Sequence, residues 1–319
     1  MSPIAALLRL RVNQRRRQLW AISAVALALS LLGLLLSWLS PAIGSPLRPG
    51  LDFTGGTQIQ IERICADRCD ELSVATVRRQ LTQLALPAVP NQPTPGLAGS
   101  AVQWLDGGRQ LVLRMPSLAP SQSQAVIDGL VPTLGETNAA GLSVETIGPT
   151  LGAQLLRASL ISLLVSFIGI SAYITIRYDR LYALLALLCL GHDVLITCGV
   201  FAWLGVLAGV EVNSLFAVAL LTIAGYSVND TVVIFDRIRE KRATMQDLPL
   251  EDQADAAVSA TLTRSLFTSF TTLLPLLGLI LFGGSTLFWF AVALSIGVIV
   301  GAWSSIAVAP TLLPVLARR

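Results

Sequence analysis

Six long apolar stretches constrain the fold of this chain more than any other feature. A helix needs about 20 apolar residues to cross a hydrocarbon core about 30 Å thick. The composition agrees, because only 13% of the residues are charged, against about 25% in soluble domains. We therefore predict an α-helical membrane protein with six transmembrane helices. The predicted spans are Leu19–Leu39, Leu155–Ile176, Leu181–Gly205, Val212–Phe235, Ser265–Phe282 and Thr286–Leu316.

The first span follows a basic segment, "RVNQRRRQ", as a signal peptide does. Its apolar run is longer than the roughly 7–15 residues of a signal peptide, and no clear A-x-A cleavage site follows it. We therefore expect an uncleaved transmembrane helix. The last span is the longest, and Gly297 and Gly301 within it have the spacing that lets two helices approach closely.

Basic residues lie in the short loops on one side of the predicted membrane only, and the opposite loops, "VLAGVE" and "GGS", contain none. The positive-inside rule then places both termini in the cytoplasm and the long segment after the first helix outside. The basic residues are Arg9, Arg11, Arg15, Arg16, Arg17, Arg177, Arg180, Arg237, Arg239, Lys241, Arg242, Arg264, Arg318 and Arg319. The predicted organisation is a cytoplasmic segment 1–18, a transmembrane helix 19–39, an extracytoplasmic domain 45–148, helices two to six in 155–316 with a cytoplasmic loop at about 237–263, and a cytoplasmic tail 317–319.

The predicted external domain has a legible order of elements. Residues 57–63 alternate as a strand does, and 71–86 repeat apolar residues at helical spacing. A strand pair then flanks "DGG", which is a hairpin signal. A second helix is predicted over 121–136, where Pro132 weakens the end, and a closing strand over 142–147. The order β-α-β-β-α-β is that of a ferredoxin-like α+β domain.

The sequence of this domain shows no recognisable set of catalytic residues. It has no histidine and no grouping of nucleophile, base and orienting residue, so a binding or mechanical role fits better than catalysis. Cys65 and Cys69 lie outside the cytoplasm in "CADRC", where they form either a local disulfide or a pair of free thiols. We predict no metal site, no cofactor and no nucleotide site, since the chain has no GxxxxGK[ST] motif.

Several polar residues fall inside the apolar spans. Asp230 lies seven residues before Arg237, which is about 10 Å inside the cytoplasmic edge. A charge at that depth is costly and marks a functional site by default. His192 and Asp193 lie near the middle of the third span, where they are either a functional pair or a polar pair that joins helices.

The fifth span offers a partner for Asp230. Thr268, Thr271 and Thr272 follow Arg264 along one helix face, although such hydroxyls also bond to their own backbone. We predict that Asp230 and Arg264 face each other. The guanidinium would favour the ionised carboxylate and burial the protonated one, so that protonation would depend on conformation. The alternative is a purely structural salt bridge.

Five segments together resemble the SecF branch of the SecD/SecF family of protein-export membrane proteins. They are "GLDFTGGTQI" (50–59), "IGPTLG" (147–152), "GHDVLITCGVF" (191–201), "LLTIAGYSVNDTVVIFDRIRE" (220–240) and "TLTRSLFTSFTTLLPLL" (261–277). Their order and spacing match the family from about residue 10 to residue 316. The third "TLTR" residue, Thr263, stands where the family has Ser and keeps the hydroxyl.

The resemblance implies one six-helix half of the resistance-nodulation-division fold, paired with a SecD half. It implies an accessory, non-enzymatic role in which inward proton flow assists protein export. Asp230 and Arg264 match the family's proton path; Asn229, Asp193, His192 and Thr268 are given supporting roles. The implied partners are SecD, the SecYEG channel with SecA, the exported unfolded polypeptide and membrane lipids, with no nucleic acid. The implied membrane is the bacterial inner (plasma) membrane or an internal one such as the thylakoid.

Two other functions stay open. One is a stand-alone proton-coupled transporter for a lipid or small molecule, and the other is a membrane scaffold in which the polar residues only join helices. Transporters of this kind contain two repeats, and this chain contains a single six-helix set. The sequence therefore favours an obligate partner.

Overall fold

The computed structural model describes residues 11–65, 69, 72–90 and 93–317. The chain divides into two compact units, one made of Met1–Pro49 with Ser159–Arg319 and the other of Gly50–Ala158. Residues 1–10 with Arg9, the tail residues Arg318 and Arg319, Glu71 of the predicted helix 71–86, and residues 66–68 of "CADRC" lie outside the described residues.

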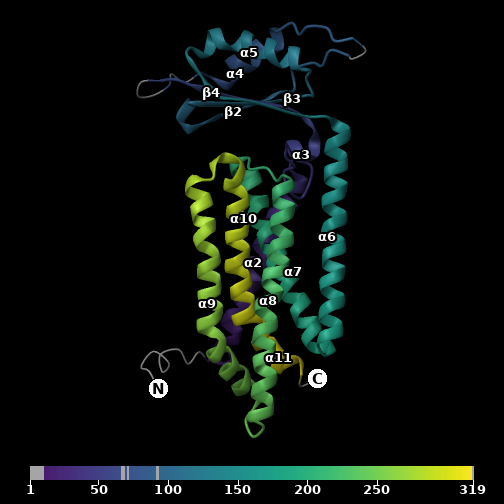
Figure 1. Ribbon diagram of the computed structural model, residues 1–319, viewed down its shortest axis with the longest axis vertical. Coiled ribbons are helices and arrows are strands. Elements are labelled where there is room, and N and C mark those ends of the chain that lie inside the picture. The colour runs from purple at the N-terminus through teal and green to yellow at the C-terminus, as the bar shows by residue number, and fades with distance from the viewer. Residues whose placement is uncertain (1–10, 66–68, 70–71, 91–92, 318–319) are drawn as a thin grey trace. The chain divides into compact units, whose positions relative to one another are not determined.

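The first unit is a bundle of long helices (Figure 1). The described residues contain six helices that are long and apolar enough to cross a membrane, which confirms the predicted number. In chain order these spans are η1 and α2 (Val12–Arg15, Arg16–Leu39), α6 (Pro149–Arg177), α7 (Arg180–Ala208), α8 (Ser214–Thr244), α9 (Leu250–Phe282), and α10, η3 and α11 (Gly284–Trp303, Ser304–Val308, Ala309–Leu316).

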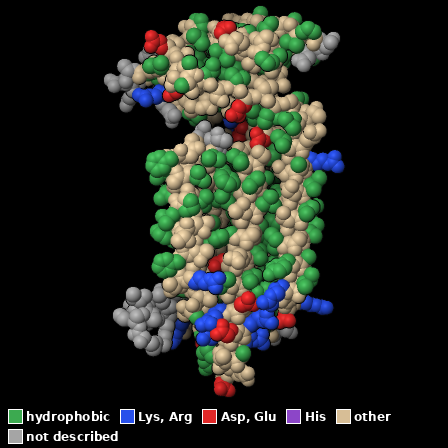
Figure 2. Space-filling view, viewed as in Figure 1, with side chains coloured by type: hydrophobic (Ala, Val, Ile, Leu, Met, Phe, Trp, Pro, Cys, Tyr) green, Lys and Arg blue, Asp and Glu red, His purple; other side chains and the backbone are tan. Residues whose placement is uncertain are grey.

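The interior of the bundle is formed by α7, α8 and the last span, whose apolar windows are more than half buried. In α2, α6 and α9 less than a fifth of the window is buried, and large apolar side chains such as Val165 and Phe267 are exposed. Figure 2 shows such side chains along the sides of the bundle. A surface of this kind suits lipid, because hydrocarbon chains are as apolar as the side chains that they contact.

The last span is not the single helix that the sequence predicts. It is interrupted by the π-helical turn η3, which separates α10 from α11. The predicted close approach is present at Gly297, where an added Cβ would lie 2.2 Å from the Ile223 side chain of α8. At Gly301 the nearest atoms would be at an ordinary contact distance of 3.5 Å.

The predicted cytoplasmic loop at about 237–263 is mostly helical. The helix α8 continues to Thr244, and α9 already begins at Leu250. These residues form helix because they are rich in Ala, Glu, Lys and Arg, which favour helices. Basic side chains gather at this end of the bundle (Figure 2), where Arg177 and Arg239 both stack on the Tyr178 ring. Burial raises the pKa of the Tyr178 phenol to about 12.

The second unit contains a four-stranded sheet with two helices. Its strands are β1 (Gly56–Arg63), β2 (Ala101–Leu105), β3 (Gln110–Met115) and β4 (Thr137–Ile147), and the longer helices are α4 (Val74–Gln83) and α5 (Pro120–Leu134). The predicted order of these elements is confirmed. The strands lie in the order β2-β3-β1-β4, and each neighbouring pair is antiparallel. The short turn η2 (Asp106–Gly108) joins β2 to β3, as the "DGG" signal predicts.

The core of this unit lies between the sheet and the two helices. Alternate strand residues such as Ile59 and Leu113 pack against Leu81 of α4 and Leu130 of α5. The short helix α3 (Leu51–Thr54) is followed by Gly55, which caps it, and by Gly56, the first residue of β1; their φ values are 68° and 126°. A Cβ on Gly56 would lie 2.6 Å from the Met115 carbonyl oxygen, so both the backbone conformation and the space require glycine.

Three predicted boundaries in this unit need correction. The first helix is shorter than 71–86, because Ser73 caps its start by accepting a hydrogen bond from the Thr76 backbone. The second helix ends at Leu134, and Pro132 stays within it. The closing strand begins at Thr137 and not at 142, because pairing with β1 extends it across a register shift.

Candidate functional site

Polar side chains from α7, α8, α9 and η3 meet inside the bundle. On α8, Ser227, Asp230 and Thr231 have the i, i+3, i+4 spacing that places them on one helix face. All three are buried, as are His192 and Asp193 of α7. The remaining members are Ser265 of α9 and Ser304 and Ser305 of η3, which are buried as well.

Asp193 is completely enclosed and fully hydrogen-bonded. Its exposed fraction is 0%, and its Oδ1 lies 2.8 Å from the His192 Nδ1. Its Oδ2 accepts hydrogen bonds from the Ser227 hydroxyl at 2.6 Å and from the Ser304 hydroxyl at 2.8 Å. One carboxylate of α7 therefore joins α8 and η3.

Asp230 is buried but only half satisfied. Its exposed fraction is 6%, and its Oδ1 accepts a hydrogen bond from the Ser265 hydroxyl at 2.8 Å. Its Oδ2 is buried and has no hydrogen-bond partner in the described part of the chain. The Ser305 hydroxyl lies 3.0 Å from the hydroxyl of Thr231, the residue after Asp230. An unpaired carboxylate oxygen in an apolar interior is a place where a proton can bind.

The predicted pairing of Asp230 with Arg264 is not formed. The Arg264 side chain is exposed and has no carboxylate within 4.0 Å among the described residues. The neighbouring residue Ser265 contacts Asp230 in its place. One residue corresponds to about 100° around a helix, and here that rotation separates the exposed Arg264 from the buried Ser265.

The other predicted residues lie on the outside of the bundle. Asn229, Thr268 and Thr271 are exposed, and Thr272 is half-buried. The three threonine hydroxyls donate to carbonyl oxygens of their own helix. We use the name α8–α9 polar face for these four residues and the exposed Arg264, that is, for Asn229, Arg264, Thr268, Thr271 and Thr272.

Sequence reasoning missed the hydroxyls that bind the two acids. Ser227 could have been found, because it lies three residues before Asp230 on the same face. Ser304 and Ser305 follow Gly297 and Gly301 in an apolar span, where serine reads as one more small residue. Another missed contact joins Tyr226 to Ser269 at 2.8 Å. Serine is small and common in membrane helices, so its presence alone does not identify a site.

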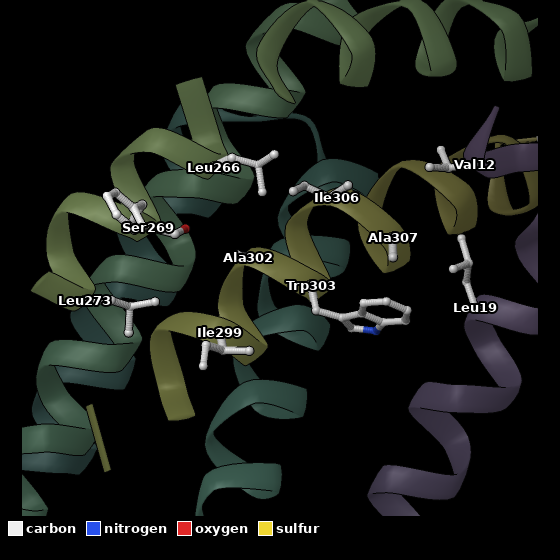
Figure 3. Close-up of a pocket in the computed structure, with 11 residues that line it drawn as sticks. Val12, Leu19, Leu266, Ser269, Leu273, Ile299, Ala302, Trp303, Ile306 and Ala307 are labelled. Carbon is white, nitrogen blue, oxygen red and sulfur yellow. The ribbon is translucent and has the colours of Figure 1, made fainter. Parts of the chain in front are cut away.

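The described residues contain no cluster of three or more His, Cys, Asp or Glu side chains that could hold a metal ion. A cavity of about 660 Å³ is lined by α9, by α10 and η3, and by the start of the chain in η1 and α2 (Figure 3). Its walls are apolar except for Ser269, so it offers no charge to a ligand. In the second unit, Cys65 and Cys69 are joined by a disulfide.

The fold and the site define a class of protein. The chain is a multi-pass membrane protein with buried acids where four of its spanning segments meet. Its sequence matches the family profile "Protein export membrane protein SecD/SecF, C-terminal" over residues 130–319 and the "SecD/SecF GG Motif" over residues 43–62. The chain belongs to the SecD/SecF family of protein-export membrane proteins.

Individual relatives agree with this assignment. The chain is 54% identical to the protein translocase subunit SecF of Prochlorococcus marinus, over 95% of this chain and 94% of that protein. It is 42% identical to the SecF of a Synechocystis species, over 92% and 90% of the two chains. It also resembles the crystal structure of SecDF from Thermus thermophilus with a TM-score of 0.76 and 30% identity, covering 94% of this chain and 38% of that one.

Proposed function

We propose that this chain is a SecF-type accessory subunit of Sec protein export that uses the proton-motive force together with a SecD partner. The observation that carries the proposal is Asp230, a buried intramembrane carboxylate with one bonded and one unpaired oxygen. Binding and release of a proton there would change the charge inside the bundle. One proton that crosses 100 mV supplies about 2.3 kcal/mol, which is enough to shift a two-state equilibrium between helix arrangements.

The need for a partner rests on the α8–α9 polar face. An exposed Arg and an exposed Asn at membrane depth are costly in lipid, so a second protein surface there would stabilise them. Relatives named SecDF contain the region matched by this chain within a longer polypeptide. We assign SecD as the partner that covers this face, and SecYEG with SecA and the exported polypeptide as the further partners.

The second unit is proposed to be an extracytoplasmic ferredoxin-like domain. Its strand order and element order fit that fold, and its disulfide fits an oxidising compartment. The basic end of the bundle supports cytoplasmic termini. The proposed location is the bacterial inner membrane or an internal membrane such as the thylakoid. The proposal assigns the chain no enzymatic reaction.

The decisive experiment replaces the titratable group and keeps its shape. Asp230→Asn is expected to abolish the part of export that depends on the proton gradient, while the variant still co-purifies with SecD. The matched control is Asp236→Asn, which removes an acid from the same helix at a half-exposed position and is expected to leave export unchanged. If export by the Asp230→Asn variant keeps its full dependence on the proton gradient, the proton role is refuted. If the variant no longer co-purifies with SecD, a membrane scaffold in which Asp230 only joins helices is favoured.

A second experiment tests the partner surface. Thr268→Trp adds bulk to the α8–α9 polar face and is expected to reduce co-purification with SecD. Leu164→Trp adds similar bulk to an exposed position of α6 and is expected to have no effect on it. Equal recovery of SecD with both variants would mean that the polar face does not contact the partner.

A further inference from the structure

Asp193 bonds to the two segments that surround Asp230. Through Ser227 it holds α8 one turn before Asp230, and through Ser304 it holds the first residue of η3. These hydrogen bonds connect residues 34 and 111 positions apart in the chain. Both bonds end on the same oxygen, Oδ2, so α8 and η3 are held at a fixed distance from each other.

The π-helical turn η3 links the hydrogen bond at Ser304 to the orientation of Ser305. Ser304 and Ser305 are adjacent, yet the Ser304 hydroxyl bonds to Asp193 and the Ser305 hydroxyl bonds to Thr231, the residue after Asp230. A π-helical turn is rare, and occurs frequently at functional sites. Without a tether at Ser304, this segment could relax toward an α-helical register, which would rotate Ser305 away from Thr231.

We propose that Asp193 is a positioning residue, which holds η3 and α8 in the register that places Ser305 against Thr231 and Asp230. The inference rests on the proposed function, because it assigns Asp193 to the same proton site. In this proposal Asp193 acts through Ser227 and Ser304, and it takes no part in proton transfer. A polar pair that only joined helices would affect stability and leave the geometry around Asp230 unchanged in the folded protein.

The geometry can be measured without any export assay. Thr231→Cys and Ser305→Cys, in a chain whose free Cys189 and Cys198 are replaced by Ala, place two thiols where the hydroxyls now meet. Adding Ser304→Ala is expected to slow disulfide formation between them in membranes about fivefold, the population change expected from one lost hydrogen bond. Thr197→Val is the control, because this buried hydroxyl of α7 bonds only to its own helix; it should leave the rate unchanged.

The second measurement asks whether the position of Ser305 affects the dependence of export on the proton gradient. It uses the chain without the introduced cysteines. Ser304→Ala is expected to reduce gradient-dependent export while co-purification with SecD is retained, and Ser304→Thr, which keeps the hydroxyl, is expected to restore it. An unchanged cross-linking rate in Ser304→Ala would overturn the inference, as would slower cross-linking with fully coupled export. If export in the Asp230→Asn variant still depends fully on the proton gradient, the proposed function fails. The cross-linking rate would still report whether the hydrogen bond from Ser304 to Asp193 positions Ser305.

Discussion

Two buried carboxylates on neighbouring helices differ in how completely the protein surrounds them. Asp193 has both oxygens bonded to side chains, and Asp230 has one oxygen bonded and one unpaired. A carboxylate bonded by several donors is held in place, and removing it leaves each donor unsatisfied. A carboxylate with an unpaired oxygen can accept a proton without breaking an existing bond. Under the roles proposed above, the difference separates an acid that positions two segments of the bundle, Asp193, from an acid that gains and loses a proton, Asp230.

The largest expected effect is on the enclosed acid. Asp193→Ala removes the acceptor of the Ser227 hydroxyl and the partner of the His192 Nδ1, and it leaves the Ser304 hydroxyl only the Gly301 carbonyl oxygen of its own helix. We expect it to lower the free energy of unfolding by about 3–5 kcal/mol, the usual cost of removing one partner from a buried charged network. Thermal or denaturant unfolding in detergent would measure it. A loss below about 1 kcal/mol would mean that the three contacts contribute little to stability.

A smaller loss is expected from removing the single donor to Asp230. Ser265→Ala leaves the whole carboxylate unpaired, which costs about 1–3 kcal/mol for a buried acceptor. The same unfolding measurement applies. Thr261→Val is the control on α9, because this buried hydroxyl bonds only to its own helix. If the two variants are equally stable, Ser265 is not an important partner of Asp230.

The smallest loss is expected when Asp230 itself is removed. Asp230→Ala deletes one hydrogen bond but also relieves a buried, incompletely paired charge, so the two effects offset each other. We expect a change of about 1 kcal/mol or less in the free energy of unfolding. A cost as large as that of Asp193→Ala would erase the contrast between the two acids and assign Asp230 a structural role.

Local sequence patterns predicted the elements well and their ends less well. The spans and the order of the small sheet follow from the periodicity of contiguous residues. The π-helical turn η3 was not predicted, because Ser304 to Val308 have no composition that distinguishes them from an α-helix. The extension of β4 to Thr137 was missed for a related reason, since it depends on pairing with Arg63 and Glu62 of β1.

The sequence by itself determined that this chain has six segments long and apolar enough to cross a membrane and that acids lie within them, because hydropathy sums over neighbours in the chain. Only the tertiary structure decided that Asp230 meets Ser265, that Asp193 joins α8 to η3, and that Arg264 lies outside. Those outcomes depend on how helices rotate against each other. A rotation by one residue, about 100°, exchanges a buried side chain for an exposed one.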